Sequence, residues 1–405
     1  MDEPEVLSRR ARRALPLMAG ALAAIVVAGL VYLHPSFPSS TKTLVARAVP
    51  SPPVIPGTYA ATFDFVTPSN GWAFLNDNLN GPQHVYLFRT TDGARHWQKQ
   101  FTGSSSQFGI QTGVQFFDRN RGLMAFGFPA QLYRTDDAGN HWARVTLPPY
   151  PVSTITFSDP SHGWVLGQEQ ATGQNPELRV RFFATTSGGG AWTELPWPAW
   201  AATLGGKGVL GGDLQFRRPN DGWLGAAADR PTVYSTSDGG ATWQPHVLPN
   251  VPPYDPALGG KPIPPGGLGS AYSTHVTLLP SSGVIAFVDY DVRSGAFTSF
   301  DGGKTWRALA PPPPEIGYFD FVFQDSTHWW AMRFGTLWKS SDAGQTWKHV
   351  GQLLDDFDYR PHVIDAKHAW AELRTSSGSR DPVTGLAMSS DAGLHWTYVN
   401  VPRPE

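Results

Sequence analysis

The sequence predicts an all-β chain, a seven-bladed β-propeller of four-stranded antiparallel blades, preceded by one N-terminal transmembrane helix. Three observations predict this fold. A short turn with one skeleton recurs seven times, a pair of short strands precedes each copy, and a charge-free stretch of 20 residues lies near the N-terminus. A turn that recurs seven times along the chain indicates a repeat architecture. Four short strands per repeat are typical of a propeller blade.

The N-terminal region predicts a membrane anchor. Four arginines (9, 10, 12 and 13) precede "ALPLMAGALAAIVVAGLVYL" at 14–33, which is long enough to cross a bilayer as a helix. Positive charge before the span predicts a cytoplasmic N-terminus and an extracytoplasmic remainder, in a single-pass cell-membrane protein. A cleavable signal peptide is the alternative, because Ala46-Arg47-Ala48 fits the small-residue rule. The expected parts are a cytoplasmic segment 1–13, a signal-anchor helix 14–33, a Pro/Ser-rich linker 34–58 and a propeller 59–405.

The repeated turn has the frame Ser/Thr, any residue, Asp, Gly or Ala, Gly, any residue, Thr or His, and Trp, as in "TSDGGATW" at 236–243. The third copy has Ser187 in place of Asp, and the first has Ala94 in place of the second Gly. Its acids and tryptophans are Asp92, Asp137, Asp238, Asp301, Asp342, Asp391, Trp97, Trp142, Trp192, Trp243, Trp306, Trp347 and Trp396. A carboxylate after a hydroxyl can accept backbone N–H bonds in a tight hairpin, and Gly allows positive φ. We therefore expect a structural role and no catalytic residue here.

The strands around each turn complete the blade. An alternating apolar strand leads through a polar turn into a second strand that usually carries Trp, as in "TFDFVTPSNGWAF" at 62–74. A third strand with an aromatic residue four positions before the Asp leads into the repeated turn in six of seven copies, and a fourth begins at its Trp. Large aromatic residues at equivalent places are what blades packed face to face need.

The turn resembles the Asp-box of bacterial neuraminidase (BNR) repeats, a motif of sialidases, xyloglucan hydrolases and several non-enzymatic propellers. Together with the strand pair before it, the arrangement most resembles the photosystem II stability/assembly factor family. The resemblance covers residues 59–402 and implies the propeller fold. Because Asp-boxes in those families lie away from the active site, it also implies that function belongs to the opposite face of the ring.

Two groups of residues are candidates for a binding face. Length variation is expected in the loops opposite the repeated turns, for example 193–212 and 250–270, and variable loops on a regular scaffold often bind ligands. Alternation along the innermost strands places polar residues on one side, near the same face. The candidates are Asp64, Asp213, Asp320, Arg360, His362, Trp197 and Trp200. A hydrated lining of the ring centre is the alternative for the polar group, and closure of a blade top is the alternative for the tryptophans.

Composition excludes several classes of function. A net charge of -2 with 16% charged residues disfavours nucleic acid. The absence of cysteine excludes disulfides, thiol catalysis and Cys-based metal sites. The histidines lack metal spacing, so no metal and no cofactor are expected.

Two functions stay open. The first is a monomeric, non-enzymatic module that binds a protein partner or a membrane complex outside the cytoplasm, or a glycan. The second is a glycoside hydrolase. A sialidase-like enzyme would need an arginine cluster, and a xyloglucanase-like enzyme would need two opposed carboxylates, which Asp64, Asp213 and Asp320 could supply. The resemblance to xyloglucanases, however, implies two propellers.

Overall fold

The computed structural model describes most of the chain after residue 54. The described residues are 55, 59–77, 82–107, 113–170, 178–197, 214–225, 227–228, 231–249, 272–290, 293–309, 321–333, 336–352, 358–374 and 385–404. All of them belong to one compact unit, Pro52–Glu405. The expected segments 1–13 and 14–33 and nearly all of 34–58 lie outside the described residues. Within the described part, no helix is long and apolar enough to span a membrane.

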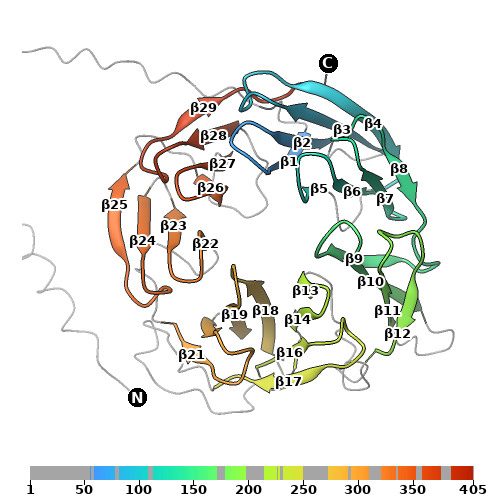
Figure 1. Cartoon of the computed structure of the whole chain (residues 1–405), viewed down its shortest axis with the longest axis vertical. Helices are drawn as coiled ribbons and strands as arrows, with labels where there is room; N and C mark the ends of the chain where they lie inside the picture. Colours follow the sequence, from blue (N-terminus) through green and yellow to red (C-terminus); the bar gives the residue numbers. More distant parts are fainter. Residues whose placement is uncertain are drawn as a thin grey trace, which may run out of the picture. The chain divides into compact units, whose positions relative to one another are not determined.

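Seven antiparallel sheets stand as blades around a central axis, with the first strand of each blade innermost (Figure 1), which confirms the predicted all-β, seven-bladed fold. Blades 1 to 3 consist of β1 (Tyr59–Phe65), β2 (Gly71–Asp77), β3 (Gln83–Thr90), β4 (Gln98–Ser105); β5 (Gly113–Phe116), β6 (Gly122–Phe126), β7 (Gln131–Thr135), β8 (Ala143–Val145); and β9 (Val152–Phe157), β10 (Gly163–Gln170), β11 (Leu178–Thr185), β12 (Thr193–Leu195). Blades 4 and 5 consist of β13 (Leu214–Arg218), β14 (Asp221–Gly225), β16 (Thr232–Thr236), β17 (Gln244–Val247); and β18 (Tyr272–Leu278), β19 (Val284–Tyr290), β20 (Arg293–Ser299), β21 (Arg307–Ala308). Blades 6 and 7 consist of β22 (Phe321–Phe323), β23 (Trp329–Arg333), β24 (Thr336–Ser340), β25 (Lys348–Gln352); and β26 (Asp358–Val363), β27 (Ala369–Arg374), β28 (Gly385–Ser389), β29 (Thr397–Val399).

One sheet departs from the predicted four strands. The short strand β15 (Ala227–Ala228) follows β14 of blade 4 but pairs antiparallel with β18, the innermost strand of blade 5. The inner edge of a blade presents unpaired backbone N–H and C=O groups. The two residues of β15 pair with part of this edge. Blade 5 therefore has five strands.

The hydrophobic core is divided among the seams between neighbouring blades. Each of the seven core clusters among the described residues combines side chains from two successive blades. The repeated aromatic residues supply much of this contact. Trp72 of blade 1 stacks on Phe116 of blade 2, and Trp164 of blade 3 stacks on Phe216 of blade 4, each with ring centroids 3.4 Å apart.

The ring closes between blades 7 and 1 without exchange of a strand, since blade 1 is built from β1 to β4 and blade 7 from β26 to β29. Trp370 of blade 7 packs on Phe65 of blade 1, with ring centroids 5.6 Å apart. Residues after β29 continue along blade 1, where Val401 is buried in the same cluster.

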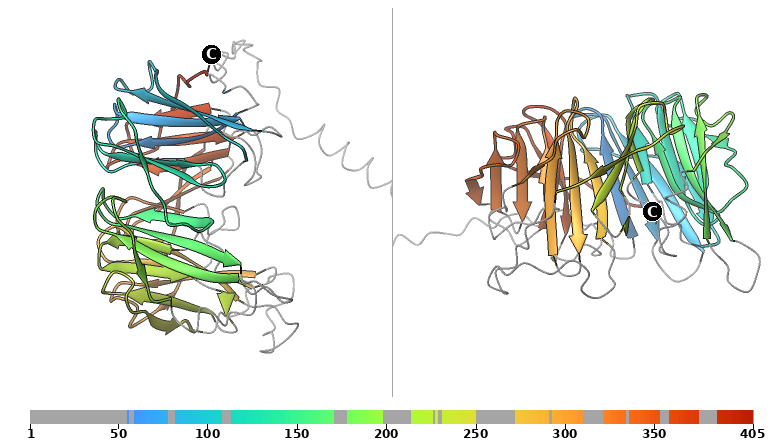
Figure 2. Two further views of the ribbon diagram at one scale, coloured as in Figure 1. Left: turned by 90° about the vertical axis from the view of Figure 1, so that its right-hand side faces the viewer. Right: turned by 90° about the horizontal axis from the view of Figure 1, so that it is seen from below.

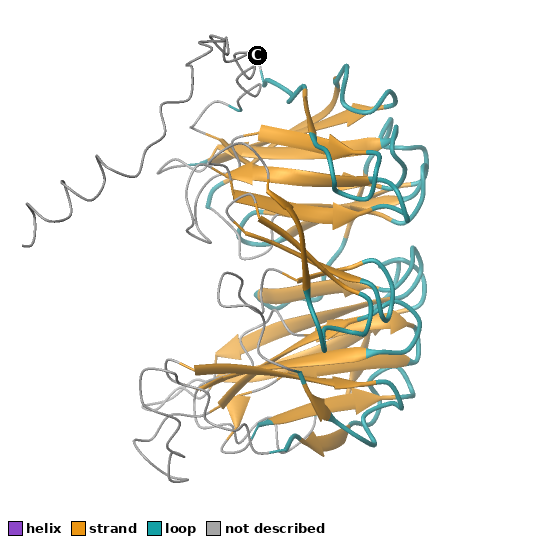
Figure 3. Ribbon diagram, turned by 90° about the vertical axis from the view of Figure 1, so that its left-hand side faces the viewer, coloured by secondary structure: helices purple, strands orange, loops and turns teal. Residues whose placement is uncertain are grey.

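The strands run roughly along the axis of the ring (Figure 2). Consequently the hairpins between first and second strands and between third and fourth strands gather at one end, shown by the teal turns of Figure 3. We call this end the repeat-turn face, because it carries all seven copies of the repeated turn. The longest loops expected on the opposite face fall largely outside the described residues.

Candidate functional site

The repeated turn is held by bonds within itself. In the fourth copy the Thr236 hydroxyl donates to Asp238 Oδ1 at 2.8 Å and accepts the N–H of Gly240 at 2.9 Å. The N–H and hydroxyl of Thr242 donate to the two carboxylate oxygens of Asp238, at 2.9 and 2.6 Å. The two residues after the Asp, Gly239 and Gly240, have φ of 76° and 97°. This conformation explains the glycines at these positions.

Histidine and threonine are alternatives at one position of this turn. His96, His141 and His395 place Nδ1 at 2.7, 2.5 and 2.5 Å from Oδ2 of the turn's Asp, where Thr242, Thr305 and Thr346 place a hydroxyl at 2.6 Å. In the third copy Ser187 replaces the acid and accepts the N–H of Ala191 at 2.9 Å. The imidazole bonds lower the pKa of Asp92 and Asp137 to about 2.

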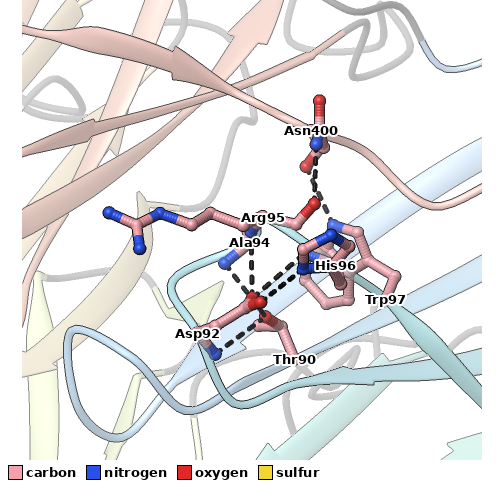
Figure 4. A network of polar contacts seen from close by, with 7 residues as sticks. All are labelled: Thr90, Asp92, Ala94, Arg95, His96, Trp97 and Asn400. Carbon is pink, nitrogen blue, oxygen red and sulfur yellow. Dashed lines mark hydrogen bonds and ion pairs between the residues drawn. The ribbon is translucent and has the colours of Figure 1, made fainter.

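Both carboxylate oxygens of the turn's Asp are therefore hydrogen-bonded within the turn, in all six copies that have the acid. Figure 4 shows the first copy, in which Asp92 Oδ1 accepts from the Thr90 hydroxyl and from the N–H groups of Arg95 and His96. The imidazole of His96 occupies the other oxygen. A group with a pKa of about 2 that is hydrogen-bonded on both oxygens is a poor general acid or base near neutral pH.

Asp64 links two neighbouring innermost strands. It lies on β1, and its Oδ2 accepts the backbone N–H of Phe116 on β5 at 2.5 Å. Burial raises the pKa of Asp64 to about 6, an effect that the Phe116 bond partly offsets. Gln215 occupies the equivalent position on β13 and makes the same kind of link, donating to the carbonyl of Val276 at 2.8 Å. At both positions the polar side chain thus bridges backbones of adjacent blades.

The other predicted site residues are only partly described. His362 lies on β26 and stacks on Trp370, with ring centroids 3.9 Å apart. Arg360 is placed on the same strand, opposite Glu372 in the register, but its side chain is not described. Asp213, Asp320 and Trp200 lie outside the described residues. Asp64 accepts a hydrogen bond from Phe116 of blade 2, whereas His362 stacks on Trp370 of its own blade. These two contacts do not place Asp64 and His362 in one binding site.

Trp197 packs as part of a seam. Its ring lies 5.5 Å from that of Phe182, edge-on, within the cluster between blades 3 and 4. The side chain is partly buried, which fits the alternative in which this residue closes the top of a blade.

Among the described residues, pockets lie on the repeat-turn face between blades 7 and 1 and between blades 5 and 6. The larger has a volume of about 660 Å³ and lies between blades 7 and 1, where Arg95, His368, Ser390 and Asn400 are among the residues that line it. We call it the seam pocket. The smaller, about 330 Å³, lies between blades 5 and 6 and includes Phe300. The sequence did not predict the seam pocket. Its one local signal was Ala94, the alanine in place of the second glycine.

Comparison with solved structures shows the same fold in proteins of low sequence identity. YCF48 bound to a D1 peptide is 16% identical, with 84% of this chain and 99% of that chain covered and a TM-score of 0.53. YCF48 from Cyanidioschyzon merolae is 14% identical, with coverages of 83% and 97% and a TM-score of 0.52. A puromycin-hydrolysing peptidase from Mycobacterium tuberculosis is 11% identical, with 84% of this chain but only 53% of that chain covered and a TM-score of 0.52. No protein-family model and no curated protein matches the chain.

Proposed function

We propose that this chain is a membrane-anchored, extracytoplasmic β-propeller that binds a protein partner and acts as an assembly or scaffold module without catalysis. The observation that carries the proposal is the match over nearly the whole length of a propeller that was solved with a peptide bound. The N-terminal charge-free span supports the anchor. A glycan is the alternative ligand, and a monomer is the proposed state.

We also propose that the repeated turns are Asp-boxes and serve the fold. Their carboxylates are engaged within their own hairpins, which supports a structural use. The glycoside hydrolase alternative would need a pair of opposed carboxylates. Of its three candidate acids, Asp64 is engaged by a backbone bond to blade 2, and the other two lie outside the described residues.

The experiment is crosslinking in intact cells that express the full chain, followed by affinity purification and mass spectrometry. The expected result is one reproducible partner with an extracytoplasmic part. Because the chain has no cysteine, Ser8→Cys and Lys304→Cys each introduce a single thiol for an impermeant maleimide. Labelling of Lys304→Cys alone in intact cells is expected from the proposed orientation. The proposal is wrong if no partner recurs, or if the purified chain hydrolyses a sialoside or a β-glucan.

A further inference from the structure

The seam pocket presents a cation that its own turn does not use. Arg95 follows the two positive-φ residues of the first repeated turn, and its backbone groups are engaged: the N–H by Asp92 and the carbonyl by Asn400. Its guanidinium extends away from this network (Figure 4), and Arg95 is among the residues that line the pocket. The one carboxylate that lines the pocket, that of Asp92, is bonded within its turn on both oxygens. Arg95 is therefore the charge that the pocket offers to a ligand.

The seam between blades 7 and 1 accommodates an alanine side chain where the other six copies of the turn have glycine. At the other six copies the second positive-φ residue is glycine, and a Cβ there would meet a side-chain atom at 2.3 to 2.8 Å. The first copy carries Ala94 at this place, and its methyl group is fully buried. The pocket beside it is twice as large as the one between blades 5 and 6. A pocket of this volume can hold a ligand that carries several functional groups.

The same seam already holds an extended polypeptide by its backbone. Trp97 Nε1 donates to the carbonyl of Asn400 at 2.9 Å, and Lys99 Nζ donates to the carbonyl of Pro404 at 2.5 Å. The Asn400 amide in turn donates to the carbonyl of Arg95 at 2.6 Å. Side chains that bond to main-chain carbonyls recognise extended chain rather than a particular sequence, and charge then supplies the selectivity.

We propose that the seam pocket binds an extended acidic segment of a polypeptide partner, with the Arg95 guanidinium paired to an Asp or Glu carboxylate. Ser390 and Asn400 also line the pocket, and in this proposal their hydroxyl and amide groups bond to polar groups of the same segment. This inference rests on the proposed function, because it names the surface and the chemistry of the partner. It places that surface on the repeat-turn face, opposite the long loops.

The test uses the full chain in detergent and two pools of random dodecapeptides, one rich in Asp and Glu and one with Asn and Gln in their place. Arg95→Glu is compared with Lys304→Glu, which makes the same charge reversal at the equivalent turn position of blade 5, outside the pocket. We expect the wild type and Lys304→Glu to retain the acidic pool about tenfold better than Arg95→Glu does. Both side chains are exposed, so we expect neither charge reversal to disturb the fold. Equal thermal unfolding midpoints of the two variants would exclude misfolding as the cause of a difference in binding.

Equal retention by Arg95→Glu and the wild type, or equal retention of the two pools by the wild type, would overturn the proposal. The cell crosslinking experiment, repeated with Arg95→Glu, separates this proposal from the proposed function. If the wild type and Arg95→Glu recover the same partner equally, the proposed ligand of the seam pocket is wrong, and the proposed function as a partner-binding module is retained. If the wild type recovers no partner, the proposed function fails, while the peptide pools still decide whether the pocket binds acidic chain.

Discussion

Two kinds of aspartate in this ring have opposite electrostatic environments. Asp92 lies at the surface, where the His96 imidazole and backbone N–H groups lower its pKa to about 2. Asp64 lies on the innermost strand, where burial outweighs its single backbone bond and raises its pKa to about 6. The first environment favours the charged form in the folded state, and the second favours the protonated form.

The two residues should therefore change stability with pH in opposite directions. Because the folded pKa of Asp64 is above the ordinary value of 3.8, its contribution is complete below about pH 4 and is lost as the pH rises to about 6. We expect Asp64→Asn, which keeps an oxygen acceptor for Phe116, to raise the free energy of unfolding above pH 6 by about 1–2 kcal/mol. Below pH 4 it should have little effect. Urea unfolding at pH 4 and pH 7 measures this difference.

Asp92→Asn is the matched control. Its folded pKa is below 3.8, so the wild-type carboxylate stabilises the fold above about pH 4, and this advantage is lost as the pH falls toward 2. The control should be destabilised at pH 7 and approach the wild type in acid. A destabilised Asp64→Asn at pH 7 would contradict the environment described for Asp64, because it would mean that the fold needs the charge.

At the scale of the element, the two positive-φ positions of the repeated turn have different neighbours. The first position holds Gly or Ala, as at Ala138, Ala343 and Ala392, all with φ between 56° and 65°. The second position contacts the preceding blade, so that a Cβ on Gly240 would lie 2.5 Å from Phe182. At the second position every glycine would place a Cβ within 2.3 to 2.8 Å of a side-chain atom, whereas the first position ranges from 2.7 Å at Gly188 to no atom within 4 Å at Gly302.

Substitutions at the two positions should differ in cost. Gly302→Ala, at the first position of the fifth copy, would place a Cβ with no atom within 4 Å, so only the backbone strain of about 1 kcal/mol applies. Gly240→Ala adds a clash with a buried ring and should lower the free energy of unfolding by about 3 kcal/mol. Thermal unfolding followed by tryptophan fluorescence compares them. Equal losses in the two variants would show that blade contact does not select glycine at the second position.

At the scale of the whole molecule, the blades and the aromatic packing between them could be predicted, whereas the polar contacts and the pocket at the seams could not. Apart from the short strand β15, each blade is built from consecutive strands, so the repeated frame around residues such as Asp238 and Trp243 was enough to count seven. The pairing of β15 with β18 and the bond between Asp64 and Phe116 join different blades, and no local pattern specifies such partners. The seam pocket depends on Arg95 and His368, which lie near opposite ends of the propeller sequence.

Closure of the ring uses a hydrogen bond that is also found at the seam between blades 2 and 3. Trp97 of blade 1 donates to the carbonyl of Asn400, the residue after the last strand of blade 7. Trp192 of blade 3 donates in the same way to Thr146, the residue after the last strand of blade 2, also at 2.9 Å. The ends of the ring are thus joined by a contact that also joins blades 2 and 3, and the tail after β29, residues 400–404, adds further contacts with blade 1.

Removal of the tail should therefore weaken one seam selectively. A chain that ends at Val399 loses the bonds from Trp97 and Lys99 and the burial of Val401, which together stabilise closure by about 2–4 kcal/mol. We expect faster hydrogen exchange of the amides of β4 and β29 and unchanged exchange in blades 3 to 5. Trp192→Phe is the control, because it removes the equivalent donor and should act on blades 2 and 3 instead. Unchanged exchange of β4 and β29 after truncation would mean that the aromatic contact of Trp370 with Phe65 closes the ring without the tail.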